Sequence, residues 1–333
     1  MASLNGVTTK SVDSGKPVVN NSVKNSVIHP GEKKTNSGLG IDFATLMVLN
    51  LIHEYAGFRA TEQLEEKIKH TFRNSDSDEL KEWISHMEKD PSKSDLNALV
   101  EDLANKETYF FRDKNQLEAY SEFLLPTLIK NKLSKVQNRI SIWSAGCSSG
   151  EEAYTLAMLL CEKLIDAKIA FRGVSNEVFF PSAWDISILG TDISRQAIRM
   201  ANDGSYKKGG FDSFRQFPED YLNYFETEAH DNHQCDESHS NDLQINNSLG
   251  QIVSFEQQNL LDDCELKQKF DIVFCRNVLI NIDPDRHKEI VLMMHDSLRD
   301  GGVLILSPVD IMPVEGLFDE VWENKCMVYE KKS

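Results

Sequence analysis

A short apolar strand that runs into a loop of small residues and then into an acidic helix start constrains this chain more than any other segment. It reads IWSAGCSSGEE at residues 142–152. Gly146 and Gly150 let backbone amides approach a ligand closely, and phosphate is the usual ligand of such a turn. Glu151 and Glu152 would repel a phosphate. The segment alone is equally typical of an ordinary strand-to-helix turn whose acidic residues complement the helix dipole.

The chain alternates strands and helices after Asn105. The expected strands are 140–144, 186–191, 252–255, 270–275, 303–307, 317–322 and 327–330. The expected helices are 151–165, 194–203 and 284–299, the last ended by Gly301 and Gly302. This alternation predicts an α/β fold with a doubly wound parallel sheet, whose ligand lies beyond the carboxyl ends of the strands.

Three further parts are expected around this sheet. Residues 1–38 show no helical or strand period and are predicted to be a disordered tail. Apolar residues recur at helical spacing in four groups further on, so 39–104 is expected to be a small all-α domain. The remainder, 105–333, is expected to be one domain with a small packed insertion at about 206–250, where aromatic residues cluster.

The composition excludes several functions. A net charge of −17 argues against sequence-independent binding to nucleic acid or to anionic membranes. No apolar run is long enough for a membrane span or a signal peptide, so a cytoplasmic location is expected. The six cysteines have no CxxC spacing and are expected to be reduced thiols. The spacing of His230, His233, Cys235 and His239 belongs to no metal motif, so no metal is expected.

Polar residues follow the expected strands at the ligand edge of the sheet. Asp192, after the second strand, is placed to accept both hydroxyls of a ribose, although it could also be only a cap of the next helix. It stands 42 residues beyond Gly150, whereas a dinucleotide fingerprint has its acid about 20 residues beyond the glycines. A dinucleotide site is therefore not the favoured interpretation.

The other strand ends suggest which ligand is bound. Asn259 and Leu260 are suited to the edge and face of an adenine, and Arg276 and Asn277 follow the fourth strand. Any of them could instead make local backbone hydrogen bonds. The two glutamates of the first loop suit a ligand that carries an ammonium or a sulfonium group. S-adenosylmethionine carries both, and an adenosine as well.

These residues belong to motifs that resemble those of the CheR family of protein-glutamate methyltransferases. The motifs are NKETYFFRD (105–113), IWSAGCSSGEEAYTLAM (142–158), ILGTDISRQAIRMANDGSY (188–206), QNLL (258–261), FDIVFCRNVLINID (270–283) and LRDGGVLIL (298–306). The likeness extends over roughly 41–330 and is clearest after Asn105. It implies a Rossmann-like class I methyltransferase fold.

The resemblance also implies roles for individual residues. Thr108 and Arg112 would reach the cofactor from the segment between the domains, and Glu151 or Glu152 would hold its amino group. Asp192 would bind the ribose, Asn259 with Leu260 the adenine, and Arg276 with Asn277 the region near the methyl group. No catalytic base is implied, and Arg112 and Asn277 are the nearest candidates to the reacting atoms. Family members methylate the γ-carboxylate of glutamates on the cytoplasmic helices of chemotaxis receptors and release S-adenosylhomocysteine.

The chain departs from the family pattern mainly where the substrate should enter. Lys106 replaces a usual asparagine, Asn281 and Ile282 replace a tyrosine and a phenylalanine, and residues 307–310 replace a Gly-His-Ser-Glu segment. Residues 41–104 carry seven basic and fourteen acidic residues, a net charge of −7 that would repel an acidic receptor helix. We therefore expect weak activity on ordinary receptor glutamates, or another protein substrate. The alternatives are a cofactor-binding regulatory or scaffold module and a small-molecule methyltransferase.

Overall fold

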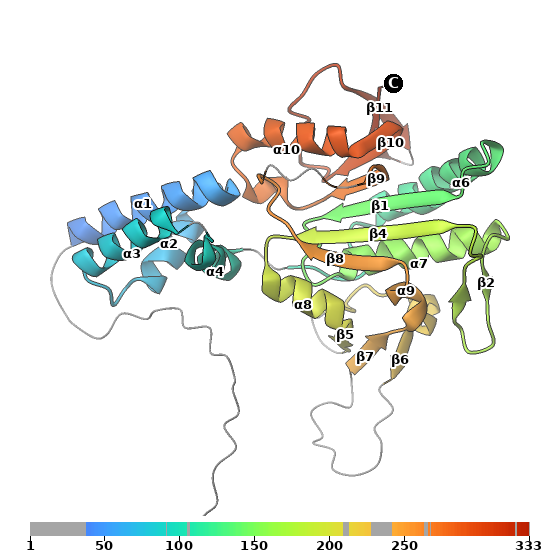
Figure 1. Cartoon of the computed structure of the whole chain (residues 1–333), viewed down its shortest axis with the longest axis horizontal. Helices are drawn as coiled ribbons and strands as arrows, with labels where there is room; N and C mark the ends of the chain where they lie inside the picture. Colours follow the sequence, from blue (N-terminus) through green and yellow to red (C-terminus); the bar gives the residue numbers. More distant parts are fainter. Residues whose placement is uncertain are drawn as a thin grey trace, which may run out of the picture.

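The computed structural model describes residues 38–90, 92–104, 107–208, 213–227, 242–262, 266, 268–323 and 325–332. A group of N-terminal helices lies beside a central sheet with helices on both faces, and a small second sheet lies below it in Figure 1. The expected tail falls outside the described residues apart from Gly38, and so does the histidine-containing part of the insert.

Four helices form the N-terminal region, as predicted. They are α1 (Gly38–Ala56), α2 (Glu62–Thr71), α3 (Ser77–Lys89) and α4 (Ser94–Leu103). Val48, Ile68 and Ile84 come from three of them and are buried in one shared apolar core, which explains the helical spacing of the sequence.

Seven strands form the central sheet in the order β11-β12-β10-β9-β1-β4-β8. They are β1 (Arg139–Ala145), β4 (Asp185–Asp192), β8 (Val253–Gln257), β9 (Phe270–Cys275), β10 (Leu298–Leu306), β11 (Phe318–Glu323) and β12 (Cys326–Lys331). The chain winds outward from β1 to β8 and returns to β9 on the other side of β1. The seven predicted strands and the doubly wound sheet are confirmed, and the switch point lies at β1.

The two faces of the sheet pack into separate apolar cores. In β1, Ile140 and Ile142 lie in the core that includes α7 (Glu151–Asp166), whereas Trp143 lies in the core that includes α10 (Pro284–Ser297). This alternation follows from the two-residue period of a strand. The remaining predicted helix is α8 (Arg195–Asp203), which follows β4.

Several short elements have no counterpart in the sequence prediction. Before β1 lie α5 (Lys114–Ala119), a π-helical turn (Tyr120–Leu124) and α6 (Leu125–Ser134). The hairpin β2 (Phe171–Arg172) and β3 (Val178–Phe179) follows α7. The insert forms a second sheet, β5-β7-β6, from β5 (Ser205–Lys207), β6 (Phe225–Thr227) and β7 (Asp242–Ile245), with a 3-10 helix (Glu219–Tyr224) and α9 (Asn247–Gly250).

The end of α10 differs from the prediction. The helix ends at Ser297, and the expectation that Gly301 and Gly302 terminate it is wrong. Leu298 already pairs with Phe270 on β9, and the register of β10 shifts between Leu298 and Val303. Gly301, at φ +69°, therefore belongs to an irregularity within a strand and not to a helix end.

Two further expectations concern the whole chain. Cys147, Cys161, Cys275 and Cys326 are buried with free thiols, as predicted, and the other two cysteines lie outside the described residues. In the part of the chain that the structure describes, no helix is both long and apolar enough for a membrane crossing.

Candidate active site

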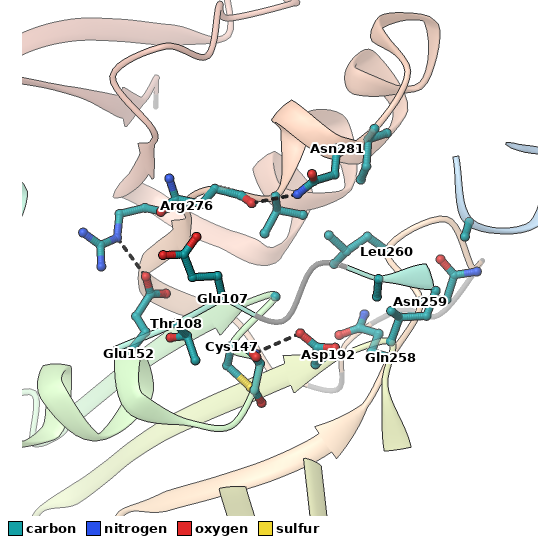
Figure 2. A pocket seen from close by; sticks show the side chains of 18 of the residues that line it. Glu107, Thr108, Cys147, Glu152, Asp192, Gln258, Asn259, Leu260, Arg276 and Asn281 are labelled. Carbon is teal, nitrogen blue, oxygen red and sulfur yellow. Dashed lines mark hydrogen bonds and ion pairs between the residues drawn. The ribbon is translucent and has the colours of Figure 1, made fainter. Parts of the chain in front are cut away.

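A cleft opens where the carboxyl ends of β1, β4, β8 and β9 meet the C-terminal end of α1 (Figure 2). Segment 107–112, which precedes α5, closes one side of it. Nine of the ten residues selected from the sequence line the cleft: Thr108, Arg112, Gly146, Glu152, Asp192, Asn259, Leu260, Arg276 and Asn277. Glu151 is the tenth and does not line it.

Backbone amides of the loop after β1 donate hydrogen bonds to the end of β4. The Gly146 amide donates to the Thr191 carbonyl oxygen at 2.7 Å, and the Ser148 amide donates to Asp192 Oδ2 at 2.9 Å. These amides are therefore not directed at a ligand phosphate. Gly146 has a φ of +76°, and a Cβ at this position would lie 2.3 Å from Val278 Cγ2, so only glycine fits.

Glu152, in the first turn of α7, brings a carboxylate to the cleft. Its Oε1 accepts from the Ser144 hydroxyl at 2.7 Å, and its Oε2 accepts from Arg276 Nε at 2.8 Å (Figure 2). The Arg276 side chain is only 2% exposed and also donates to the Arg112 carbonyl oxygen at 2.9 Å. Arg276 therefore orients Glu152, whose oxygens retain acceptor capacity for a further donor such as an ammonium group.

Glu151 is turned toward the insert. Its carboxylate accepts from the Ser149 hydroxyl at 2.8 Å and from the Ser213 hydroxyl at 2.7 Å. Burial raises the pKa of the Glu151 carboxyl, although both hydrogen bonds act in the opposite direction. Of the two glutamates that the sequence left open, the structure brings only Glu152 to the cleft.

Asp192 ends β4 and joins two loops. Its Oδ2 accepts from the Ser148 amide, and its Oδ1 accepts from the Ser194 amide at 2.9 Å. The cap of α8 is the Ser194 hydroxyl, which accepts from the Ala197 amide at 3.1 Å. Asp192 is therefore more than a helix cap, and a carboxylate with about four acceptor sites retains capacity for ligand hydroxyls.

The segment after β8 adds an apolar wall and the carboxamide side chains of Gln258 and Asn259 to the cleft. Leu260 lies there with Ala56 and Phe58, which come from the end of α1 and the segment after it. Asn259 is buried, and its Nδ2 donates to the Tyr55 carbonyl oxygen at 2.7 Å. Asn259 thus ties the loop after β8 to α1.

The segment after β9 forms the opposite wall. Asn277 has a φ of +59°, which is uncommon for residues other than glycine. Its amide donates to Ser307 Oγ, and its carbonyl oxygen accepts from Asn281 Nδ2 at 3.2 Å. Asn281 belongs to a 3-10 helix (Leu279–Asn281) and lines the cleft as well (Figure 2).

Aromatic packing fixes segment 107–112 over the cleft. Phe110 is fully buried, and its ring centroid lies 4.9–5.6 Å from those of four aromatic residues, Tyr206, Phe214, Phe217 and Phe225. The insert thereby anchors the segment that carries Thr108 and Arg112. Asn105 and Lys106, at the start of the same motif, lie outside the described residues.

Some lining residues were not selected from the sequence. Gln258, Cys147 and Glu107 line the cleft, as do the two residues near the end of α1. Burial, with the nearby charges of Asp192 and Glu152, raises the pKa of the Cys147 thiol well above its usual range, so this thiol stays protonated at neutral pH. The QNLL motif already contained Gln258, but nothing in the sequence indicated that α1 reaches the cleft.

A separate group of side chains has the spacing of metal ligands. His53, Asp283 and Asp285 offer ligand atoms within 4.8 Å of one another where α1 meets α10. His53 Nε2 lies 3.5 Å from Asp285 Oδ2, and Asp283 caps α10. The contact between His53 and Asp285 and the helix cap by Asp283 account for these side chains, and the expectation that no metal is bound stays a prediction.

Comparisons with known proteins found a family model and relatives that match this chain. Residues 106–325 match the model of the family described as CheR methyltransferase, SAM binding domain. The chain is 29% identical over 227 residues to the chemotaxis protein methyltransferase of Borreliella burgdorferi. This alignment covers 68% of this chain and 71% of that protein. It is 32% identical over 238 residues to chemotaxis protein methyltransferase 1 of Vibrio cholerae. This second alignment covers 71% of this chain and 76% of that protein.

Proposed function

Because the chain belongs to the CheR methyltransferase family, with S-adenosylmethionine as its cofactor, we propose that it methylates a glutamate carboxylate of a protein in chemotaxis. The names of its relatives, chemotaxis protein methyltransferases, support a role in that process. The proposed acceptor is a chemoreceptor or a related signalling protein, and the proposed location is the cytoplasm. We also propose that 39–104 and 105–333 act as separate domains, with the cofactor bound mainly by the second.

The observation that carries this proposal is the order of chemical groups along the strand ends. Glu152, held by Arg276, lies at the ends of β1 and β9, Asp192 at the end of β4, and Leu260 beyond β8. An elongated ligand with an amino-acid end, a ribose and an aromatic base meets, in the same order, a carboxylate, a second carboxylate and an apolar wall. S-adenosylmethionine has these three parts.

Methyl transfer to a carboxylate depends on positioning of the reactants more than on acid-base catalysis. When bound, S-adenosylmethionine supplies a methyl group on a sulfonium, so that a C–O bond forms as the C–S bond breaks and the sulfur leaves as a thioether. A glutamate carboxylate has a pKa of about 4.3 and is already deprotonated at neutral pH, so no general base is needed. The cleft residues act by alignment and by excluding water, with Arg112 and Asn277 nearest to the acceptor.

The substrate side of the cleft supports weak activity on an ordinary, strongly acidic receptor helix, or another protein substrate. The N-terminal helices carry a net charge of −7, which would slow encounter with an acidic partner. Asn281 and Ile282 line the cleft at positions where the family usually has aromatic residues. A receptor domain that is fully labelled at physiological salt would contradict this part of the proposal.

The test is methyl transfer itself. Purified protein is mixed with S-adenosylmethionine that carries a radioactive methyl group and with extracts from cells that lack the protein. The measured quantity is the label that base treatment releases as methanol. We expect base-labile label on glutamates of one or a few proteins, located by mass spectrometry. Asp192→Ala should give less label, because the loss of the ribose acceptor should weaken cofactor binding by roughly 1–3 kcal/mol. Binding of S-adenosylhomocysteine without any methyl ester would instead support the regulatory or scaffold alternative.

A further inference from the structure

We propose that Arg215 is a positioning residue that holds residues 107–109 against the cleft, so that the cofactor enters and leaves only when this contact opens. The inference rests on the cofactor part of the proposed function and not on the protein substrate. Residues 107–109 are the first half of segment 107–112, and all three line the cleft. Arg215 belongs to the insert and does not line the cleft that the described residues form. It therefore acts on the cleft through the segment.

Arg215 makes two contacts with the first half of the segment. Its Nη2 donates to Glu107 Oε1 at 2.8 Å, and its guanidinium carbon lies 3.8 Å from the centroid of the Tyr109 ring, where the ring attracts a cation. Arg112 also donates to the Glu107 carbonyl oxygen at 2.8 Å, but this bond lies within the segment and does not join it to the insert. The side chains of Arg215 and Glu107 are 25% and 58% exposed, so water can replace their ion pair at modest cost.

The second half of the segment is fixed in a different way. Phe110 is fully buried among aromatic rings of the insert, and its amide donates to the Ser213 carbonyl oxygen at 2.9 Å. The Phe111 amide donates to Thr155 Oγ1 on α7 at 3.2 Å. Displacing this half would expose a buried ring and break two hydrogen bonds of the backbone, which costs more than opening a half-exposed ion pair. Phe110 is therefore the fixed point, and residues 107–109 move at the least cost.

The other walls of the cleft are joined to the N-terminal region. The Arg59 amide donates to the Asn281 carbonyl oxygen at 3.0 Å, which holds the segment after β9. The buried carboxamide of Asn259 donates to the Tyr55 carbonyl oxygen at 2.7 Å, which holds the segment after β8. Backbone groups take part in both contacts, whereas residues 107–109 are held to the insert by a half-exposed guanidinium. The route of cofactor exchange therefore passes residues 107–109.

The test follows S-adenosylhomocysteine alone, by surface plasmon resonance for both rate constants and by calorimetry for the affinity. In Arg215→Met, the association and dissociation rate constants should both rise about fivefold, because the ion pair and the ring contact that close the passage are lost. The dissociation constant should change less than about twofold, since opening of the passage limits both directions equally. Adding Glu107→Gln to Arg215→Met should not raise the rate constants further, because the ion pair is already lost.

Arg172 offers a matched control. It pairs with Glu162, and its guanidinium carbon lies 4.7 Å from the ring centroid of Tyr224 in the insert. Its side chain is 20% exposed, close to the value for Arg215, and it does not touch segment 107–112 through these contacts. Arg172→Met should therefore leave both rate constants within about twofold of the wild type, unless a general loosening of the insert is what speeds exchange.

Three outcomes overturn the proposal. They are wild-type exchange rates in Arg215→Met, a rise in its dissociation rate constant without a rise in its association rate constant, and equally fast exchange in Arg172→Met. A wild-type protein that binds no S-adenosylhomocysteine instead overturns the cofactor assignment, and this proposal with it. Methyl transfer that fails while these rate constants behave as expected leaves this proposal standing and contradicts the proposed function alone.

Discussion

Adjacent residues in the same helical turn take different parts in this site. Glu151 and Glu152 are separated by one residue step of a helix, so one side chain faces the insert and the other faces β1. The sequence predicts that carboxylates are present at this point, because the motif ends the loop with both. It cannot predict which one reaches the cleft, since that depends on where Ser213 of the insert and Arg276, which follows β9, come to lie.

This division of roles gives a prediction for a matched pair of variants. Glu152→Gln removes the charge proposed to bind the cofactor amino group and should weaken S-adenosylhomocysteine binding by about 2 kcal/mol, or roughly 30-fold. Glu151→Gln keeps the shape of the buried side chain and should change the affinity less than about twofold, since Glu151 does not line the cleft. Calorimetry at neutral pH measures both. Equal losses in the two variants would mean that both glutamates serve the cofactor.

The raised pKa of Glu151 predicts how stability depends on pH. An acid whose pKa is raised by folding binds more protons in the folded state, so the free energy of unfolding falls as pH rises from the unfolded pKa, about 4.3, through the folded value. Glu151→Gln does not titrate. Its stability relative to the wild type should therefore increase from pH 4 to pH 7 in urea unfolding of the cofactor-free protein. A difference that stays flat over this range would contradict the assigned cause.

The same contrast between pattern and geometry holds at the scale of elements. The strands were predictable because residues such as Val273 and Phe274 make continuous apolar runs that pack on both faces. The end of α10 was not, because Gly301 and Gly302 look like a helix terminator, and only the pairing of Leu298 with β9 shows that the strand has already begun. The hairpin after α7 and the strands of the insert are too short to leave a period in the sequence.

The packing of the loop after β1 against the segment after β9 can be tested directly. Gly146→Ala places a Cβ against Val278 Cγ2 at a φ of +76°, so it should lower the free energy of unfolding by about 2 kcal/mol or more. Combining it with Val278→Ala removes the clash but not the backbone strain. We expect the double variant to be more stable than the sum of the two single losses predicts. Strictly additive losses of unfolding free energy in urea would show that residues 146 and 278 are not in steric conflict in Gly146→Ala.

At the scale of the whole molecule, the N-terminal helices are part of the site. The Asp283 amide donates to the Gly57 carbonyl oxygen at 2.7 Å, and the Arg59 amide donates to the Asn281 carbonyl oxygen at 3.0 Å. The end of α1 therefore borders the cleft, and we expect the charge of the N-terminal helices to affect the approach of a substrate. Their charge and helical pattern could be predicted from the sequence, but their contact with the segments after β8 and β9 depends on long-range packing that no local pattern records.

The acidic character of these helices gives a prediction about association. The second-order rate constant kcat/KM for an acidic protein substrate should rise as ionic strength increases from 0.05 to 0.15 M, because salt screens repulsion over a Debye length of about 10 Å. Glu62→Lys with Glu66→Lys, both exposed on α2, should raise kcat/KM about threefold or more at low salt. Glu320→Lys on the edge strand β11 changes charge away from the cleft and should have a much smaller effect. A rate constant that instead falls with salt would mean that a basic surface of this chain, and not its acidic helices, meets the substrate.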